Sequence, residues 1–165
     1  MPTDRALGLR PGFTMIEMLA VLAVIGILAI MAIPSLQEKL IRDQVLEALP
    51  IADVAKAPVA LSWALTQTVP ADNDAAGLPA ADKIVGNYVS STRIEGGAIQ
   101  ITFGNRANQA LKGKLLSLRP AVVADAPIVP VAWVCGNATV PDKMTVKGQN
   151  RTDIPNVLLP VRCRP

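Results

Sequence analysis

The chain has 165 residues, a formal net charge of +3 at pH 7 and no histidine. This length suits one packed domain together with one membrane helix rather than two full domains. The absence of histidine excludes histidine metal ligands and the histidine base of Ser/His and Cys/His enzymes, and the small net charge does not by itself indicate binding to nucleic acid.

An uncharged apolar segment lies close to the N-terminus. Residues 18–37, MLAVLAVIGILAIMAIPSLQ, are twenty consecutive positions without a charge. As a helix rising 1.5 Å per residue they cover roughly 30 Å, which is the thickness of the hydrocarbon core of a bilayer. Glu17 stands just before them, and a carboxylate in a membrane helix costs about 2.5–3.5 kcal/mol at the centre and less near an end. We therefore expect Glu17 to have a partner or a function.

The residues around Glu17 form a recognisable pattern. Gly12-Phe13-Thr14-Met15-Ile16-Glu17, followed directly by the apolar helix, resembles the processing and assembly site of type IV pilins. In that family a prepilin peptidase cuts after the glycine, the new N-terminal Phe is N-methylated, and the carboxylate neutralises the terminal amine during filament assembly. The resemblance implies that Gly12 and Phe13 form the processing site, that Phe13 is methylated, and that Glu17 acts in assembly.

Residues 1–12 are predicted to be a leader peptide. They contain Arg5 and Arg10, which favour the cytoplasmic side by the positive-inside rule. The alternative is an ordinary secretory signal, whose apolar region spans only about 7–15 residues and ends in a small-x-small cleavage site. Here the run is longer, and Ile30 occupies the first small position before a cut after Ala32, so this alternative is disfavoured.

The helix is expected to change character after the apolar run. Residues 13–36 are predicted to be the transmembrane and assembly helix, and residues 37–65 an amphipathic continuation into a globular head. Four apolar residues of the continuation recur at helical spacing: Ile41, Val45, Leu49 and Ala52. Glu38 and Arg42 stand four residues apart in the favourable order for an ion pair.

Three prolines predict bends in this long helix, because each removes a helical hydrogen bond. They are Pro34, Pro50 and Pro58. In type IV pilins the helix is half protruding and half packed on the head, and Pro34 coincides with the helix proline of the family. The resemblance also suggests that the segment from Gly26 to Pro34 unwinds when subunits pack into a filament.

The remaining sequence predicts loops and short strands. Residues 66–87 are rich in turn formers and predict a long loop that joins helix to sheet. Strands are expected at residues 88–94, 99–103, 115–118 and 129–135, with Glu95-Gly96-Gly97 as a hairpin turn. Four strands without intervening helices predict an antiparallel meander laid against the long helix, an α+β fold with a head at residues 66–165.

Cys135 and Cys163 are the only cysteines. In an exported chain, such a pair indicates a disulfide rather than a zinc or redox site, which would need more ligands. Residues 133–136 and 154–164 also resemble the C-terminal disulfide loop of major type IVa pilins, although Leu158 stands where that family usually has Tyr. The resemblance therefore favours a major subunit, with a closed loop over residues 135–163.

The sequence thus predicts a non-enzymatic pilus subunit without cofactor or metal. Its expected partners are copies of itself in a helical filament, prepilin peptidase and the pilus assembly machinery of the inner membrane, and it is expected in that membrane before assembly and on the cell surface afterwards. Adhesion, twitching motility or DNA uptake would be the filament's use. The alternatives are a minor pilin, a secretion pseudopilin, or a membrane-tethered periplasmic binding module or enzyme.

Two further signals are discounted. Asn137-Ala138-Thr139 and Asn150-Arg151-Thr152 fit the N-glycosylation pattern, which is too permissive to predict use. The tail is basic and could contact DNA, but it lacks the aromatic residues that stack on bases, so a solvated rim is the preferred interpretation. Its cations are Lys143, Lys147, Arg151, Arg162 and Arg164.

Overall fold

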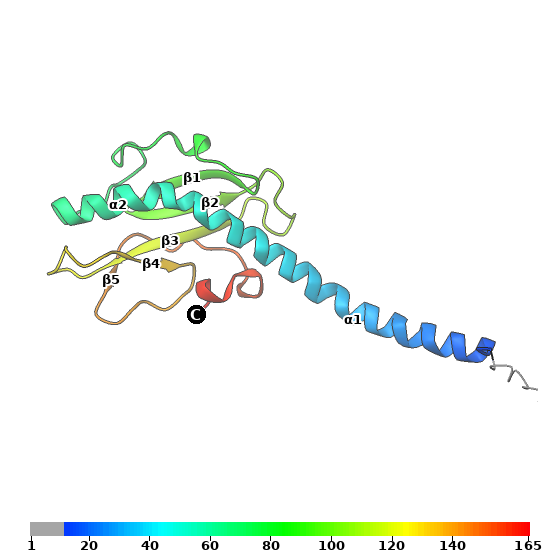
Figure 1. Cartoon of the computed structure of the whole chain (residues 1–165). Coiled ribbons are helices and arrows are strands. Elements are labelled where there is room, and N and C mark those ends of the chain that lie inside the picture. Colours follow the sequence, from blue (N-terminus) through cyan, green and yellow to red (C-terminus); the bar gives the residue numbers. More distant parts are fainter. Residues whose placement is uncertain (1–11) are drawn as a thin grey trace, which may run out of the picture. The chain divides into compact units, whose positions relative to one another are not determined.

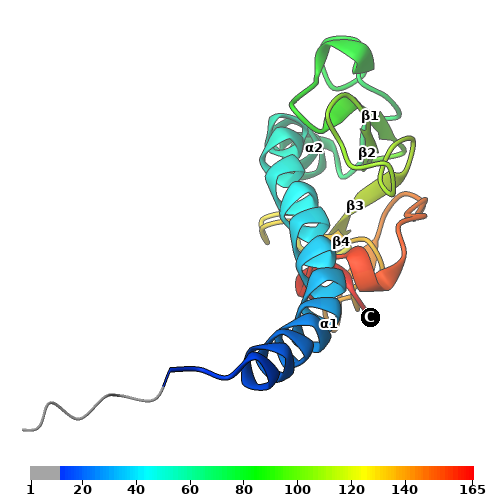
Figure 2. The ribbon, with the colours of Figure 1, turned by 90° about the vertical axis from the view of Figure 1, so that its right-hand side faces the viewer.

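The computed structural model describes residues 12–165, so residues 1–11 of the predicted leader lie outside the described part. The chain divides into two compact units, one ending at Gln37 and one from Glu38 to Pro165, which we call the head unit. Figures 1 and 2 show the elements of the head unit from two directions.

The observed helices agree closely with the helix predicted from the sequence. Helix α1 runs over Met15–Ala48, a 3₁₀ turn occupies Leu49–Ala52, and α2 runs over Asp53–Thr66. The α-helical pattern is interrupted at the 3₁₀ turn, which contains Pro50. Pro34 and Pro58 instead lie inside α1 and α2. Because a helix can lose one hydrogen bond and continue, only one of the three prolines ends an α-helix.

One face of these helices is buried within the head unit. The four apolar positions predicted to face the core are all buried, which confirms the amphipathic pattern. The stripe continues into α2, where a period of three to four residues is kept across the 3₁₀ turn. Its members are Ile41, Val45, Ala48, Leu49, Ala52, Ala55, Val59 and Trp63.

The sheet is the predicted antiparallel meander, and the α+β fold is confirmed. Its strands follow the order β1-β2-β3-β4, with a short β5 paired to β3. β3 is longer than predicted and β4 shorter, and β5 was not predicted because two residues give no detectable periodicity. The bounds are β1 Val89–Glu95, β2 Ala98–Phe103, β3 Leu115–Val122, β4 Ala132–Cys135 and β5 Thr145–Val146.

The hairpin between β1 and β2 depends on two glycines. Gly96 has φ of 54° and Gly97 has φ of 83°, which is the positive-φ pair that a two-residue type I′ turn requires. A Cβ on Gly97 would also lie 2.6 Å from the Cβ of Val69. The turn predicted from Glu95-Gly96-Gly97 is therefore confirmed, and the second glycine also allows the loop after α2 to approach it.

Both faces of the sheet are covered within the head unit. Ile99, Ile101 and Phe103 belong to the apolar core that also contains the buried helix stripe. Gln100 points to the other face, yet it is also fully buried. Its amide accepts a hydrogen bond from the Ser117 hydroxyl at 2.6 Å and donates one to the Gln149 carbonyl at 3.1 Å. The C-terminal loop thus crosses this face, and the polar side chains of the sheet hold it there.

The outer edge of β1 is closed by Asn73, from the loop after α2. Its side-chain oxygen accepts a hydrogen bond from the Ile94 N–H at 2.6 Å, and its amide donates to the Thr92 carbonyl at 3.2 Å and to the Pro79 carbonyl at 2.9 Å. One buried side chain therefore satisfies edge groups that would otherwise be open to another strand.

We expect Asn73→Ala to destabilise the head unit by about 1–3 kcal/mol, because it leaves buried backbone groups without partners. Urea unfolding of the full chain in detergent micelles measures this loss. The matched control is Asn150→Ala, which removes two exposed side-chain hydrogen bonds and should cost less than the loss at Asn73, because solvent can replace the lost partners. Equal losses in the two variants would contradict the role given to Asn73.

Candidate assembly and processing site

The predicted processing residues lie immediately before a helix start. Gly12, Phe13 and Thr14 precede α1 and have no regular structure. The Thr14 hydroxyl oxygen accepts a hydrogen bond from the Glu17 N–H at 3.3 Å, and the Thr14 carbonyl accepts one from the Met18 N–H at 3.2 Å. Thr14 is thus the N-cap of α1, and Glu17 is the third residue of its first turn.

Sequence reasoning missed this cap, although a signal was present. Thr14-Met15-Ile16-Glu17 has the S/T-x-x-E spacing of a capping box, in which an acidic third residue supports the start of a helix. A carboxylate near the positive end of the helix dipole is also favourable. Glu17 therefore has a local structural role in addition to the assembly role that the resemblance implies.

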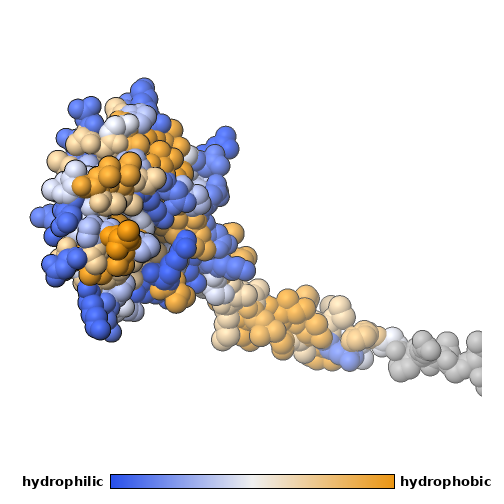
Figure 3. Space-filling view, turned by 60° about the vertical axis from the view of Figure 1, so that its left-hand side comes forward, coloured by the Kyte–Doolittle hydropathy of each residue, from blue (hydrophilic) through white to orange (hydrophobic). Residues whose placement is uncertain are grey.

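The surface of the first unit is apolar. All side chains described from Gly12 to Ile33 are exposed, and Glu17 is the only charged residue between Met15 and Gln37. Figure 3 shows the hydrophobic colour over the helical part of this unit. By length and composition the helix can cross a membrane. Burying a side chain such as Leu or Ile stabilises by about 1.5–3 kcal/mol, so this surface favours lipid or other apolar helices over water.

Gly26 and Pro34 lie inside the uninterrupted helix α1. A Cβ on Gly26 would meet no atom within 4 Å, so no neighbouring group in the subunit requires a glycine there. A glycine inside a helix costs about 1 kcal/mol relative to alanine, and proline cannot donate to the Ile30 carbonyl four residues earlier. The two residues weaken the same part of α1, and whether it unwinds in a filament stays a prediction.

The disulfide predicted for the C-terminal loop is present. Cys135 ends β4 and Cys163 lies in the 3₁₀ turn Val161–Cys163, with an S–S distance of 2.00 Å. The Asn137 N–H donates to the Cys163 carbonyl at 2.9 Å. Gly136 between them has φ of 53°, and a Cβ there would lie 2.9 Å from that carbonyl oxygen. Glycine at position 136 therefore lets the two ends of the loop meet at this distance without the strain that a side chain would add.

A half-buried arginine supports the same corner. Arg119 of β3 donates from Nη2 to the Gly136 carbonyl at 3.1 Å. Burial removes water from its guanidinium and lowers the pKa of Arg119 from its ordinary value.

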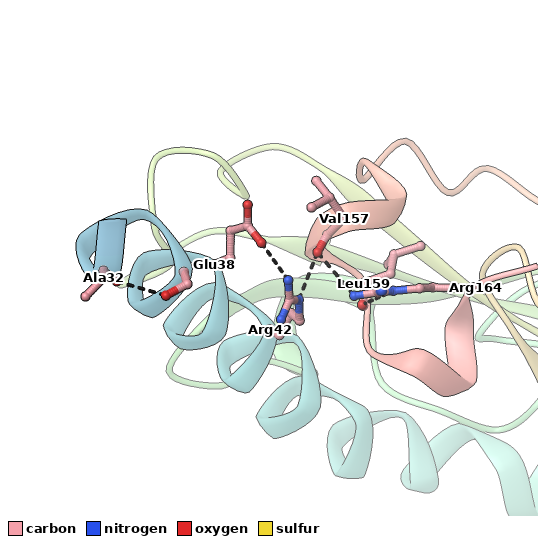
Figure 4. Close-up of polar contacts among 7 residues, drawn as sticks. Ala32, Glu38, Arg42, Val157, Leu159 and Arg164 are labelled. Carbon is pink, nitrogen blue, oxygen red and sulfur yellow. Dashed lines mark hydrogen bonds and ion pairs between the residues drawn. The ribbon is translucent and has the colours of Figure 1, made fainter. Parts of the chain in front are cut away.

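Helix α1 holds the C-terminal loop through Arg42. Figure 4 shows the guanidiniums of Arg42 and Arg164 converging on the Val157 carbonyl, with N···O distances of 2.8 and 3.2 Å. Arg42 also pairs with Glu38 at 2.7 Å, which confirms the predicted ion pair, and Arg164 donates to the Leu159 carbonyl at 2.8 Å. The contact between Arg42 and Val157 spans 115 residues and could not be read from local spacing.

The head unit also has an open hollow of about 840 Å³, lined by parts of the loop after α2, the end of β1 and the loop before Arg151. Arg93 and Arg151 both pair with Glu95, at 3.0 and 2.9 Å. Asn73 in its wall is already bonded to Ile94, Thr92 and Pro79, so this side chain is not free to bind a ligand. Among residues 12–165, no three His, Cys, Asp or Glu side chains lie together as metal ligands would.

Comparison with known proteins identifies the family. The pilin family of bacterial filament proteins matches residues 42–164, and the prokaryotic N-terminal methylation motif matches residues 10–33. The chain belongs to the type IV pilin family. The two matches together cover both the helix start described above and the sheet with its disulfide.

Relatives of this pilin come from Neisseria. A type IV major pilin protein PilE of Neisseria gonorrhoeae is 33% identical over 78% of this chain and 75% of its own length. A fimbrial protein of Neisseria meningitidis serogroup A is 34% identical over 94% of this chain and 95% of its own length. Pilins are structural subunits, and this is not an enzyme family.

We expect Cys163→Ser to lower the free energy of unfolding of the pilin by about 2–5 kcal/mol, because the loop is no longer closed in the unfolded chain. Urea unfolding in detergent measures the loss, and faster amide exchange of residues 150–160 should accompany it. The purified wild-type chain, denatured without reductant, should show no reactive thiol. A free thiol in most molecules would contradict the bond in the exported protein.

Proposed function

We propose that this pilin is the major subunit of a surface type IV pilus. The main support is the exposed apolar helix of the first unit. It begins at Met15, two residues after Phe13, and its one charged residue before Gln37 is Glu17, in the first turn. Such a helix is stable in two surroundings, the inner membrane before assembly and the centre of a filament afterwards. The subunit passes from one to the other.

The proposed precursor has four parts. Residues 1–12 are a leader cut by prepilin peptidase after Gly12. Residues 13–36 form the membrane and assembly helix, residues 37–65 its amphipathic continuation, and residues 66–165 the rest of the head with its disulfide loop. Gly12 and Phe13 lie outside regular structure, which supports access by a peptidase because proteolysis requires extended chain.

Glu17 is proposed to pair with the terminal ammonium of Phe13 in a neighbouring subunit. A filament interior that is apolar leaves neither a bare carboxylate nor a bare ammonium stable, and pairing the two removes both costs. The segment from Gly26 to Pro34 is proposed to unwind there, since it contains a glycine and a proline that both disfavour a helix.

A major subunit is favoured over a minor pilin or a pseudopilin. The relatives named above are major pilins or fimbrial proteins, and the disulfide closes a loop resembling that of major subunits. Adhesion, twitching motility and DNA uptake are the proposed uses of the filament. Strains lacking the chain, tested for attachment, surface spreading and transformation, separate these three uses.

We expect the mature chain to begin at Phe13 with a monomethylated amine. Intact-mass and N-terminal fragment spectra of the chain from sheared surface filaments test this. An unprocessed Met1, or a chain beginning at Ile33 as a secretory signal would produce, would contradict the proposal.

We expect Glu17→Ala to leave membrane insertion intact while strongly reducing surface filaments. Removing a charge makes the helix more apolar, and Arg5 and Arg10 still favour the cytoplasmic side. Loss of one partner from a buried ion pair typically costs about 3–5 kcal/mol, and a filament repeats this loss at every subunit.

Electron microscopy of cells with wild-type levels of membrane-bound protein measures the filaments. The matched control is Glu47→Ala, which removes an exposed carboxylate of the same helix and should change filament number little. Wild-type filament numbers in Glu17→Ala would mean that Glu17 is a solvated residue worth less than about 1 kcal/mol.

A further inference from the structure

The base of the head unit combines cationic and exposed apolar side chains. We define the base surface as the residues of α1 that directly follow the uncharged run, together with the C-terminal residues that Arg42 and Arg164 hold beside them. Its members are Lys39, Leu40, Arg42, Val157, Val161, Arg162 and Arg164.

The number of residues after the uncharged run sets the depth of Lys39 and Arg42 relative to the bilayer. The uncharged run ends at Gln37, and Arg42 follows five residues later, which is roughly 8 Å along a helix. The headgroup layer on each side of a bilayer is about 5–8 Å thick. If the run crosses the bilayer, Lys39 and Arg42 therefore lie at the level of the phosphates.

The C-terminal part is held beside Arg42 by hydrogen bonds. Arg42 and Arg164 donate to one acceptor, the Val157 carbonyl (Figure 4), so their guanidiniums lie within a few ångströms of each other. Val161 and Arg162 occupy the 3₁₀ turn that ends one residue before Arg164. The tail cannot leave Arg42 without losing the hydrogen bond between Arg42 and the Val157 carbonyl.

The charge of the base suits an anionic surface. Residues 38–43 and 156–164 hold four cations and two carboxylates, Glu38 and Asp43, for a net charge of +2. Glu38 is already paired with Arg42. Residues 13–165 as a whole also carry +2, since the predicted leader contains two arginines and one aspartate. All of the net positive charge of the processed chain is therefore at the base.

The apolar side chains of the base have no cover within the described residues 12–165. Val161 is 83% exposed, Leu40 56% and Val157 49%. Exposed aliphatic groups between cations are typical of surfaces that lie in the headgroup region, where apolar groups enter the acyl boundary and cations meet the phosphates.

We propose that the base surface docks the unassembled head on anionic phospholipid headgroups of the membrane that its own helix crosses. Val161 enters the boundary between headgroups and acyl chains, while Lys39, Arg162 and Arg164 contact phosphates. The proposal rests on the membrane insertion proposed above. Docking holds the head against the membrane before assembly and is lost when the subunit is drawn into a filament.

The test places the full chain in lipid nanodiscs that carry a gadolinium chelate on a few headgroups. One set contains only phosphatidylcholine, and the other contains one third phosphatidylglycerol. Relaxation of the Val161 methyl resonances by gadolinium reports their distance from the headgroups. We expect strong relaxation in the anionic discs, weak relaxation in the neutral ones, and loss of the difference at high salt.

The diagnostic variant is Lys39→Gln with Arg162→Gln, which spares the two arginines that hold the loop. Each cation near an anionic surface contributes about fivefold in binding, so the double variant should lower the ratio of docked to undocked heads about 25-fold. The matched control, Lys83→Gln with Lys143→Gln, removes two exposed cations outside the base and should leave the relaxation unchanged.

Insertion is measured separately in the same discs by amide exchange of residues 18–37. Loss of their protection would refute the membrane insertion on which both proposals rest. If these amides stay protected and the Val161 relaxation is equal in the two lipid sets, docking alone is refuted. A Val161 resonance that shifts with the number of chains per disc, without relaxation, would show a second copy on the base and would also refute it.

Discussion

Helix α1 has to satisfy two surroundings with one continuous backbone. Up to Gln37 its apolar side chains are exposed, and from Glu38 one apolar stripe is buried in the core that includes the sheet, while Leu40 and Leu46 stay exposed. A helix suits both because its backbone hydrogen bonds are internal and do not depend on the solvent around it. The change from one surrounding to the other falls within about two helical turns, between Leu36 and Arg42. The rest of the head is arranged around the buried stripe.

The head then depends on holding a long C-terminal segment against this frame. The segment has little regular structure, so its ordering must be offset by specific contacts. The disulfide closes its ends, the buried Gln100 and Ser117 bind its middle across the sheet, and Arg42 holds the turn at Val157. These contacts are one covalent bond and two sets of hydrogen bonds, placed at three different points of the segment.

Side chains near the start of α1 have more than one role. Thr14 caps the start of the helix and Glu17 lies in its first turn, while the roles proposed above for Glu17 and Phe13 are in assembly and processing. Arg42 likewise pairs with Glu38, binds the tail and lies where α1 leaves the apolar run. Short polar segments next to an apolar helix combine such roles because few polar side chains can be placed there at low cost.

Much of the fold could be predicted from local pattern. The uncharged run, the helical spacing of Ile41, Val45, Leu49 and Ala52, and the Gly96-Gly97 turn each follow from the preferences of neighbouring residues. The pattern of Gly12, Phe13 and Glu17 could likewise be recognised because these residues lie close together in the sequence. The two cysteines could be paired because no other partner exists in the sequence.

Long-range contacts were decided only by the tertiary structure. Nothing near Gln100 indicates that residue 149 covers it, and nothing near Asn73 indicates that it closes the edge of β1. The length of β3 and the existence of β5 also depend on tertiary structure, because both are set by the pairing of β3 with β4 and β5. Local propensity is encoded by neighbours in sequence, whereas the partner of a buried amide or of Arg42 is set by chain segments tens of residues away. The sequence by itself therefore determined the membrane-length helix, the hairpin and the cysteine pair, and tertiary packing alone decided what binds the tail.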